Sequence, residues 1–230
     1  MQTELYQKCV ERNTIVCLET GGGKTFIAVM LIKHFSHQLE DPEQQSDDPN
    51  DLNNIGKRTI FLVPTIPLVN QQAKAIEMHT NLKVGKFFGE EFDYYTKFEW
   101  LKEMKKYQVF VMIHEIFRMV IHHGFIPLSK LNLLIFDEVH HATKNHPYRE
   151  IMTCFDNCPV EDQPRIMGLS ASLINNSISP AKLEESIKSL ENTMRSNCDT
   201  TCDIRSLNKY AAKPKEVICY YEQYDASKLI

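Results

Sequence analysis

Long apolar runs are missing from this sequence, and their absence argues against one large class of proteins. No stretch approaches the ~20 consecutive apolar residues that a membrane-spanning helix needs. The residues after Met1 also lack the basic and apolar regions of a secretory leader. We therefore expect a cytoplasmic protein without a membrane partner.

A disulfide framework and a broad positive charge are missing as well. The 230 residues contain 7 cysteines, an odd number that is typical of free thiols in a reducing compartment. The formal net charge is −4, and leaving out the six carboxylates between residues 40 and 51 brings it only to +2. Any nucleic acid must therefore be held by local contacts and not by a wide basic surface.

The cysteine spacing leaves one metal hypothesis open. Cys154 and Cys158 are four residues apart, and so are Cys198 and Cys202. Two such pairs are compatible with zinc, although the spacing is loose for a structural zinc site. Packing residues or exposed thiols are the ordinary alternative.

Glycine is scarce, and its distribution is informative. Three of the 8 glycines are consecutive: Gly21, Gly22 and Gly23. An apolar run before them predicts a buried strand, Lys24 and Thr25 follow them, and a second apolar run predicts a buried helix. This is the pattern of a phosphate-binding loop, in which Lys24 contacts the β- and γ-phosphates and Thr25 holds Mg²⁺. The strict pattern begins with glycine where this chain has Leu18, and an ordinary turn into a helix is the alternative.

Two carboxylates end another apolar run. Residues 133–136 predict a buried strand, and Asp137 and Glu138 follow it. Parallel sheets bind their ligands at the carboxyl ends of strands. Asp137 would hold Mg²⁺ through water, and Glu138 would orient or deprotonate an attacking water molecule. A strand running into an acidic loop is the alternative, but the two motifs together predict an ATP site.

Predicted strands and helices alternate about six times along the chain. This alternation predicts an α/β fold with a mostly parallel sheet and helices on both faces. We expect one domain over residues 1–215, with an acidic surface loop inserted at 39–56. We interpret residues 216–230 as the lead-in segment, the stretch of chain that connects this domain to a following one.

Three sequence blocks stand in order at predicted strand ends, at residues 20–25, 137–140 and 170–172. They resemble the first RecA-like domain of a superfamily 2 helicase of the Asp-Glu-x-His type. More narrowly, the N-terminal helicase module of the Dicer family is resembled by residues 13–29, 82–85, 131–140, 146–152, 157–159 and 164–172. The resemblance covers nearly the whole chain and implies a RecA-like P-loop domain.

The resemblance implies a role for each matching residue. Gln2 matches a glutamine that reads adenine. The other nucleotide-binding positions are Glu19, Thr20, Gly21, Gly22, Gly23, Lys24, Thr25, Asp137 and His140. Lys24 and Glu138 match the catalytic residues, and Thr25 and Asp137 match the Mg²⁺ ligands. His140 couples the ATP site to the other motifs, and Ser170 and Ser172 link hydrolysis to RNA contact, unless these serines are turn hydroxyls.

The RNA face is implied by a shorter match. Pro64, Thr65, Gln71 and Gln72 resemble a block that touches one RNA strand through phosphate and sugar. Gln72 can equally be read as a surface amide of a helix. Many relatives carry Thr-Pro where this chain has His114 and Glu115, which can equally be ordinary loop residues, so the second RNA contact stays open.

The resemblance implies a larger protein with ATP and Mg²⁺ as cofactors and double-stranded RNA as partner. It implies the remaining helicase and ribonuclease III domains and a double-stranded-RNA-binding partner protein. We expect a chain that begins inside such a protein, or one that comes from an incomplete gene model. Alone it should bind nucleotide weakly and hydrolyse it slowly or not at all, because the family completes the ATP site with arginines from a second RecA-like domain.

The expected function is an RNA-helicase-type ATPase within a Dicer-like ribonuclease, active in small-RNA biogenesis. One alternative is an antiviral RNA sensor of the same branch. Another is a non-hydrolysing scaffold for RNA or a partner protein, which intact Lys24, Thr25, Asp137 and Glu138 disfavour. A P-loop ATPase unrelated to nucleic acid is disfavoured by the blocks at 64–72 and 170–172.

Overall fold

The computed structural model describes residues 2–39, 55–143, 145–171 and 180–200. Four features named above lie outside these residues: most of the acidic loop, Ser172, Cys202 and the lead-in at 216–230.

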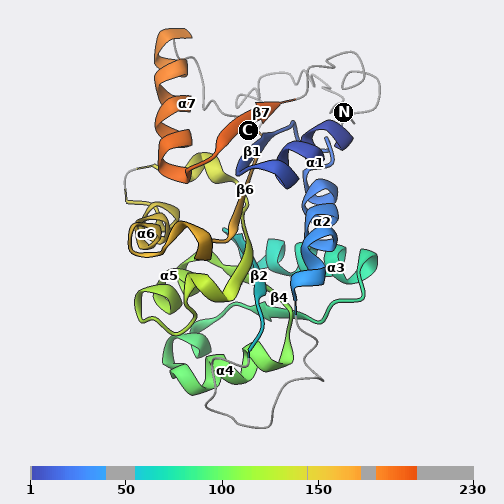
Figure 1. The fold of residues 1–230 in the computed structure, drawn as a ribbon, viewed down its shortest axis with the longest axis vertical. Helices are drawn as coiled ribbons and strands as arrows, with labels where there is room; N and C mark the ends of the chain where they lie inside the picture. Colours follow the sequence, from blue (N-terminus) through green and yellow to red (C-terminus); the bar gives the residue numbers. More distant parts are fainter. Residues whose placement is uncertain (1, 40–54, 144, 172–179, 201–230) are drawn as a thin grey trace, which may run out of the picture.

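A seven-stranded sheet forms the centre of the described domain (Figure 1). The strands lie in the order β3-β4-β2-β5-β6-β1-β7, and every neighbouring pair is parallel. Their bounds are β1 Thr14–Cys17, β2 Arg58–Val63, β3 Val84–Phe87, β4 Val109–Ile113, β5 Leu131–Phe136, β6 Arg165–Ser170 and β7 Asn197–Thr200. Because all the strands run in one direction, their carboxyl ends line a single edge of the sheet.

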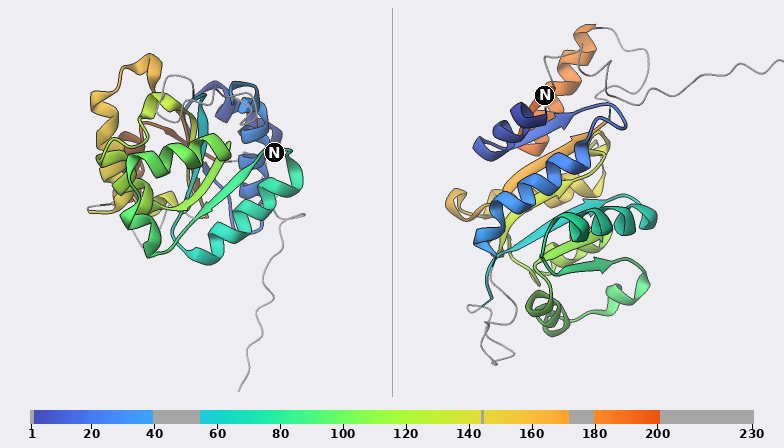
Figure 2. Two further views of the ribbon diagram at one scale, coloured as in Figure 1. Left: turned by 90° about the horizontal axis from the view of Figure 1, so that it is seen from below. Right: turned by 90° about the vertical axis from the view of Figure 1, so that its right-hand side faces the viewer.

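Helices cover both faces of this sheet, as Figure 2 shows from two further directions. One face carries α1 Gln2–Glu11, α2 Lys24–Phe35 and α3 Ile66–His79. The other carries α4 Lys97–Lys106, α5 His114–His122, α6 Pro147–Thr153 and α7 Pro180–Met194. The predicted parallel α/β architecture with helices on both faces is confirmed.

Two apolar cores hold these layers together, because successive residues of a strand point to opposite faces. Ile15 of β1 lies in the core under α4–α7, while Val16 lies in the core under α1–α3. Leu134 and Ile135 of β5 divide in the same way. A strand buried on both faces needs a continuous apolar run, which is the signal that located these strands in the sequence.

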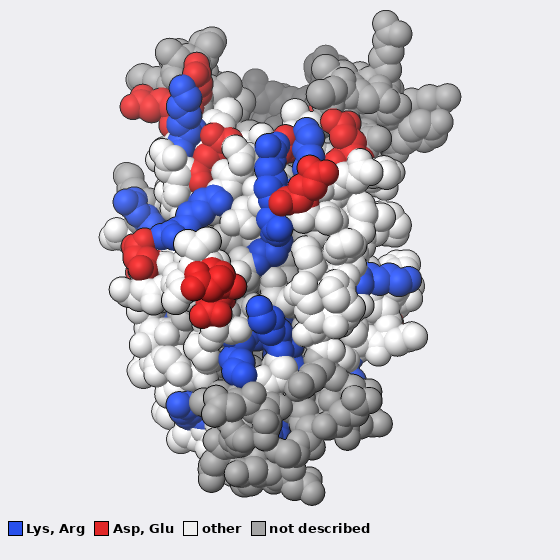
Figure 3. Space-filling model, viewed as in Figure 1, with Lys and Arg blue, Asp and Glu red and all other residues white. Residues whose placement is uncertain are grey.

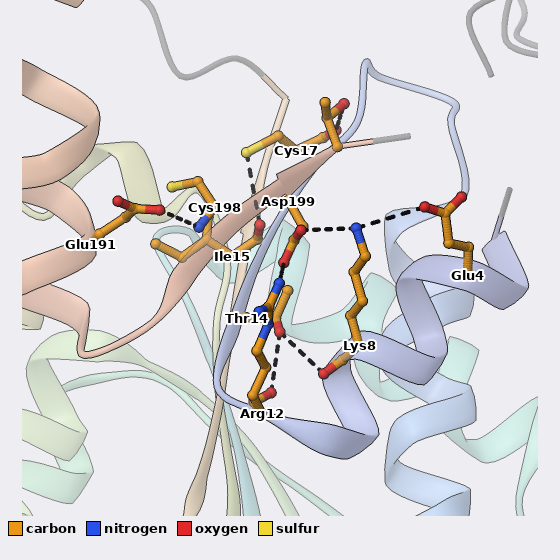
Figure 4. A network of polar contacts seen from close by, with 10 residues as sticks. Glu4, Lys8, Arg12, Thr14, Ile15, Cys17, Glu191, Cys198 and Asp199 are labelled. Carbon is orange, nitrogen blue, oxygen red and sulfur yellow. Dashed lines mark hydrogen bonds and ion pairs between the residues drawn. The ribbon is translucent and has the colours of Figure 1, made fainter. Parts of the chain in front are cut away.

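The edge strand β7 was missed by the sequence reading. Its residues are Asn197, Cys198, Asp199 and Thr200, none fully buried, and among the described strands it pairs with β1 alone. Figure 4 shows how Asp199 ties this strand to α1. One carboxylate oxygen accepts a hydrogen bond from Lys8 Nζ at 2.9 Å, and the other accepts one from Arg12 at 2.9 Å. These bonds fix helix α1, which carries Gln2.

Two surface and length properties of the described residues bear on the charge and the apolar runs discussed above. Over the described residues of the face in Figure 3, positive and negative side chains are interspersed and form no field of one sign. Among the described helices the longest is α7 with 15 residues, and none has the length and apolar character needed to cross a membrane.

Candidate active site

The phosphate-binding motif forms the connection from β1 to α2, at the carboxyl edge of the sheet. Gly21 and Gly23 have φ angles of 82° and 90°, which favour glycine because a Cβ is strained there. A Cβ on Gly22 would approach the Glu19 carbonyl oxygen to 2.9 Å. The loop therefore depends on glycine at these positions. Glu19 and Thr20 are exposed, and Thr25 lies half-buried in the first turn of α2.

The departure from the strict motif at Leu18 is accommodated by the fold. The Leu18 side chain is buried in the core under α1–α3. Its backbone contributes to the site, because the Leu18 carbonyl accepts a hydrogen bond from Lys24 Nζ at 2.8 Å. Its N–H donates to the Ser170 carbonyl at 3.1 Å. Leucine at this position thus leaves the lysine and the loop in place.

Gln2 lies against this loop. Its side-chain nitrogen donates to the Gly22 carbonyl oxygen at 3.3 Å, across 20 residues of sequence. A Cβ on Gly23 would come within 2.1 Å of the same nitrogen. The structure therefore places the predicted adenine-reading side chain beside the predicted phosphate loop.

The two acids follow β5 at the same edge. Asp137 is buried, and its carboxylate accepts a hydrogen bond from the Glu138 N–H at 3.0 Å. Burial and the charge of Glu138 raise the pKa of Asp137 to about 6. An adjacent cation opposes such a shift because it favours the ionised carboxylate. The donor set of Thr25 and Asp137, with a cationic Lys24 nearby, fits an oxygen-ligated Mg²⁺ and a polyphosphate.

His140 joins these acids to the third block. Its Nδ1 lies 3.0 Å from the Ser170 hydroxyl and 3.3 Å from a Glu138 carboxylate oxygen. Ser170 is fully buried at the end of β6, between β5 and β1 in the sheet. Burial and the neighbouring His141 lower the pKa of His140. The structure thus brings together His140, Glu138 and Ser170, while Ser172 lies outside the described residues.

The four residues predicted to contact RNA differ in their exposure to solvent. Thr65 and Gln71 are exposed and Pro64 is half-buried, beyond the carboxyl end of β2. Gln72 is buried, so its interpretation as a surface amide is wrong. Its side-chain nitrogen donates to Asp137 at 3.4 Å, because its position on α3 turns it toward the strands and not toward solvent. Its carbonyl oxygen has no hydrogen-bond partner among the described residues.

A cluster of aromatic rings, not predicted from the sequence, packs beside the turn that carries the two acids. The Tyr148 hydroxyl donates to the backbone carbonyl of Asp137 at 2.7 Å. His114 and His146 pack on the Tyr148 ring, with centroid distances of 5.3 and 4.6 Å. His114 is the first residue of α5, so the alternative that placed it in a loop is wrong. The only sequence signal for this cluster is the block at 146–152, which contributes to the family resemblance.

The described cysteines are not gathered into a metal centre. Cys154 and Cys158 pack against the core under α4–α7, and Cys198 lies beside Cys17. Within the described residues, no group of three histidines, cysteines or carboxylates is placed to hold a metal ion. Cys202, the fourth member of the zinc hypothesis, is not among them.

The chain is similar over nearly its whole length to proteins named endoribonuclease Dicer and dcr-1. Endoribonuclease Dicer of Danio rerio is 44% identical over 223 residues, covering 97% of this chain and 11% of that protein. Endoribonuclease dcr-1 of Caenorhabditis elegans is 40% identical over 228 residues, covering 97% of this chain and 12% of that protein. The chain thus spans about a tenth of the length of these relatives.

A solved structure and a protein-family model also match this chain. The Hef helicase domain of Pyrococcus furiosus has a similar structure, with a TM-score of 0.66 and 26% identity. That match covers 89% of this chain and 39% of the other, and it confirms the RecA-like helicase fold. The family model for DEAD/DEAH box helicases matches residues 1–179, and this family implies ATP with a divalent metal ion. The chain therefore belongs to the DEAD/DEAH box helicase family.

Proposed function

We propose that this chain is the ATP-binding half of a Dicer-type helicase module, which binds double-stranded RNA and couples ATP hydrolysis to RNA handling in small-RNA biogenesis. The observation that carries the proposal is the position of His140. One ring nitrogen lies within hydrogen-bond distance of both Glu138 and Ser170. The residue assigned to water activation is thereby joined to the residue assigned to RNA coupling.

Each residue has a separate task in this proposal. Gln2 reads the adenine, while Lys24 and the backbone N–H groups of the glycine loop hold the phosphates. Thr25 and Asp137 hold Mg²⁺, which when bound offsets the charge of the β- and γ-phosphates. Glu138 accepts the proton of the attacking water.

RNA would lie along the same sheet edge. Pro64, Thr65 and Gln71 follow β2, the strand next to β5, so they stand beside the acids in the sheet order. We assign them to phosphate and sugar contacts, which position a duplex without reading its sequence. Gln72 is a less favourable RNA contact than the other three, because its amide faces Asp137.

We also propose which domains and which partner protein accompany this domain in the full-length protein. The relatives are named endoribonucleases, and this chain spans only 11–12% of them. We assign the chain to a cytoplasmic protein with further helicase domains, ribonuclease III domains and a double-stranded-RNA-binding partner protein. Tested alone, the chain should hydrolyse ATP slowly or not at all, because arginines from a second RecA-like domain can supply orders of magnitude in rate.

The experiment measures ATP turnover by the full-length protein with and without blunt double-stranded RNA. The variant Glu138→Gln should lower RNA-stimulated turnover by at least about 100-fold, the size of a general-base effect. The control Glu77→Gln removes an exposed carboxylate of α3, paired with Lys86 at 3.7 Å, and should leave turnover unchanged. Duplex binding without turnover would favour the scaffold, and turnover indifferent to RNA would favour an ATPase unrelated to nucleic acid.

A further inference from the structure

The turn between the two acids is strained and needs support. Glu138 has φ 48° and ψ 46°, the left-handed conformation that side chains with a Cβ rarely adopt. Among the described non-glycine residues, only Arg195 shares a positive φ. Strain of this kind persists where the surroundings fix the backbone. The contacts that fix this turn therefore set the direction of the Glu138 side chain.

The peptide group between Asp137 and Glu138 is fixed on both sides. Its N–H donates to the Asp137 carboxylate at 3.0 Å. Its carbonyl oxygen accepts from the Tyr148 hydroxyl at 2.7 Å. Rotation of this peptide would break both bonds and redirect the Glu138 side chain, so the Tyr148 hydroxyl restrains the second acid through the backbone of the first.

The Tyr148 ring is held on several sides, so its hydroxyl has a defined position. The side chain is 1% exposed, and its ring meets Phe136 of β5 edge-on at 5.0 Å. His146 caps α6 by accepting a hydrogen bond from the Tyr148 N–H at 3.3 Å. His114 packs edge-on against the same ring at 5.3 Å. Three elements, β5, α6 and α5, thus hold one tyrosine behind the acids.

The two histidines pack as neutral rings. Burial lowers the pKa of His114, and burial together with His114 and His141 lowers the pKa of His146 to about 4. Both are therefore uncharged near pH 7, so their edge-on packing at a centroid distance of 5.0 Å involves no repulsion between cations. The cluster is a stable apolar support for the tyrosine at that pH.

We propose that Tyr148 is a positioning residue for ATP hydrolysis, whose hydroxyl orients the Asp137–Glu138 peptide and thereby the carboxylate of Glu138. This inference rests on the proposed function, because it needs Glu138 to activate the water. It adds a residue outside the three helicase blocks, on helix α6, to the hydrolytic machinery.

The test is Tyr148→Phe in the full-length protein, which removes the hydroxyl and keeps the ring. We expect kcat for ATP to fall about tenfold, since misplacing a catalytic group by about 1 Å can lower the rate by up to about 100-fold. The Kd of a fluorescent ATP analogue should stay within about twofold, because the loop around Lys24 is untouched. Tyr6→Phe is the matched control, since it also removes a tyrosine hydroxyl bond, to His34 at 3.0 Å.

A double-mutant cycle separates positioning from a general loss of structure. If Tyr148 acts through Glu138, Tyr148→Phe should have little further effect on the residual rate of Glu138→Gln. Turnover is normalised to the folded fraction, measured by circular dichroism. The inference is overturned if the normalised kcat of Tyr148→Phe matches that of Tyr6→Phe, or if the two effects multiply. If Glu138→Gln itself leaves turnover intact, the proposed function fails instead.

Discussion

Asp199 of β7 forms ion pairs with Lys8 of α1 and with Arg12, which follows this helix. The effect of breaking these pairs on stability can be predicted from the structure. Asp199→Asn removes the charge that accepts hydrogen bonds from Lys8 and Arg12, both at 2.9 Å (Figure 4). The Asp199 side chain is 12% exposed, but Lys8 and Arg12 are 28% and 50% exposed. Hydrogen bonds to charged groups contribute about 1.5–3 kcal/mol each when buried, and exposed ion pairs about 0–1 kcal/mol. We expect a loss of about 1–2 kcal/mol in the free energy of unfolding.

The same variant should show a defined pH dependence. Burial raises the pKa of Asp199, but the hydrogen bonds and charges of Lys8 and Arg12 outweigh it and lower the pKa below its ordinary value of 3.8. A lowered folded-state pKa means that the stabilisation is complete above the unfolded-state value and is lost as pH falls through the folded-state value. The difference between wild type and Asp199→Asn should therefore be constant from pH 7 to 5 and shrink below pH 4.

Urea denaturation of the full chain at several pH values measures this difference. The control Glu184→Gln breaks an ion pair with Lys188 whose partners are 71% and 67% exposed, and it should change stability by less than about 0.5 kcal/mol. Equal stability of Asp199→Asn and wild type at pH 7 would refute the reasoning. So would a difference that grows as the pH falls.

Three further predictions concern the site and the core. Gly23→Ala should weaken ATP-analogue binding at least tenfold in a fluorescence titration, because its Cβ would collide with Gln2 at φ 90°. Lys24→Ala should abolish that binding yet cost only about 1 kcal/mol of stability, the contribution of one hydrogen bond, seen in thermal unfolding. Trp100→Ala should cost about 3–5 kcal/mol in denaturant titration, because this side chain is fully buried. Unaltered nucleotide affinity in the first two variants, or a change under 1 kcal/mol in the third, would contradict these expectations.

The positions of the ATP motifs could be predicted because parallel strands place their carboxyl ends at one edge. Strands β1, β5 and β6 are adjacent in the sheet, so Lys24, Asp137 and Ser170 lie at the same sheet edge although more than 100 residues separate the first two. Apolar runs identified these strands, since both faces of each strand are buried.

The remaining features depend on tertiary packing that local patterns do not encode. Strand β7 has no apolar run, because it lies at the sheet edge and is only half-buried. The contact of Gln72 with Asp137 depends on how α3 is rotated against the sheet. The Tyr148 bond joins helix α6 to the turn after β5, and sequence spacing says nothing about that distance.

The coupling between nucleotide and RNA is the central claim, and linkage provides its most direct test. The measurement is the Kd of a non-hydrolysable ATP analogue for the full-length protein, with and without saturating blunt double-stranded RNA. Coupling through His140 and Ser170 predicts several-fold tighter binding with RNA, and the analogue must tighten RNA binding by the same factor. An ATP-analogue Kd that does not change when RNA is added would contradict the account.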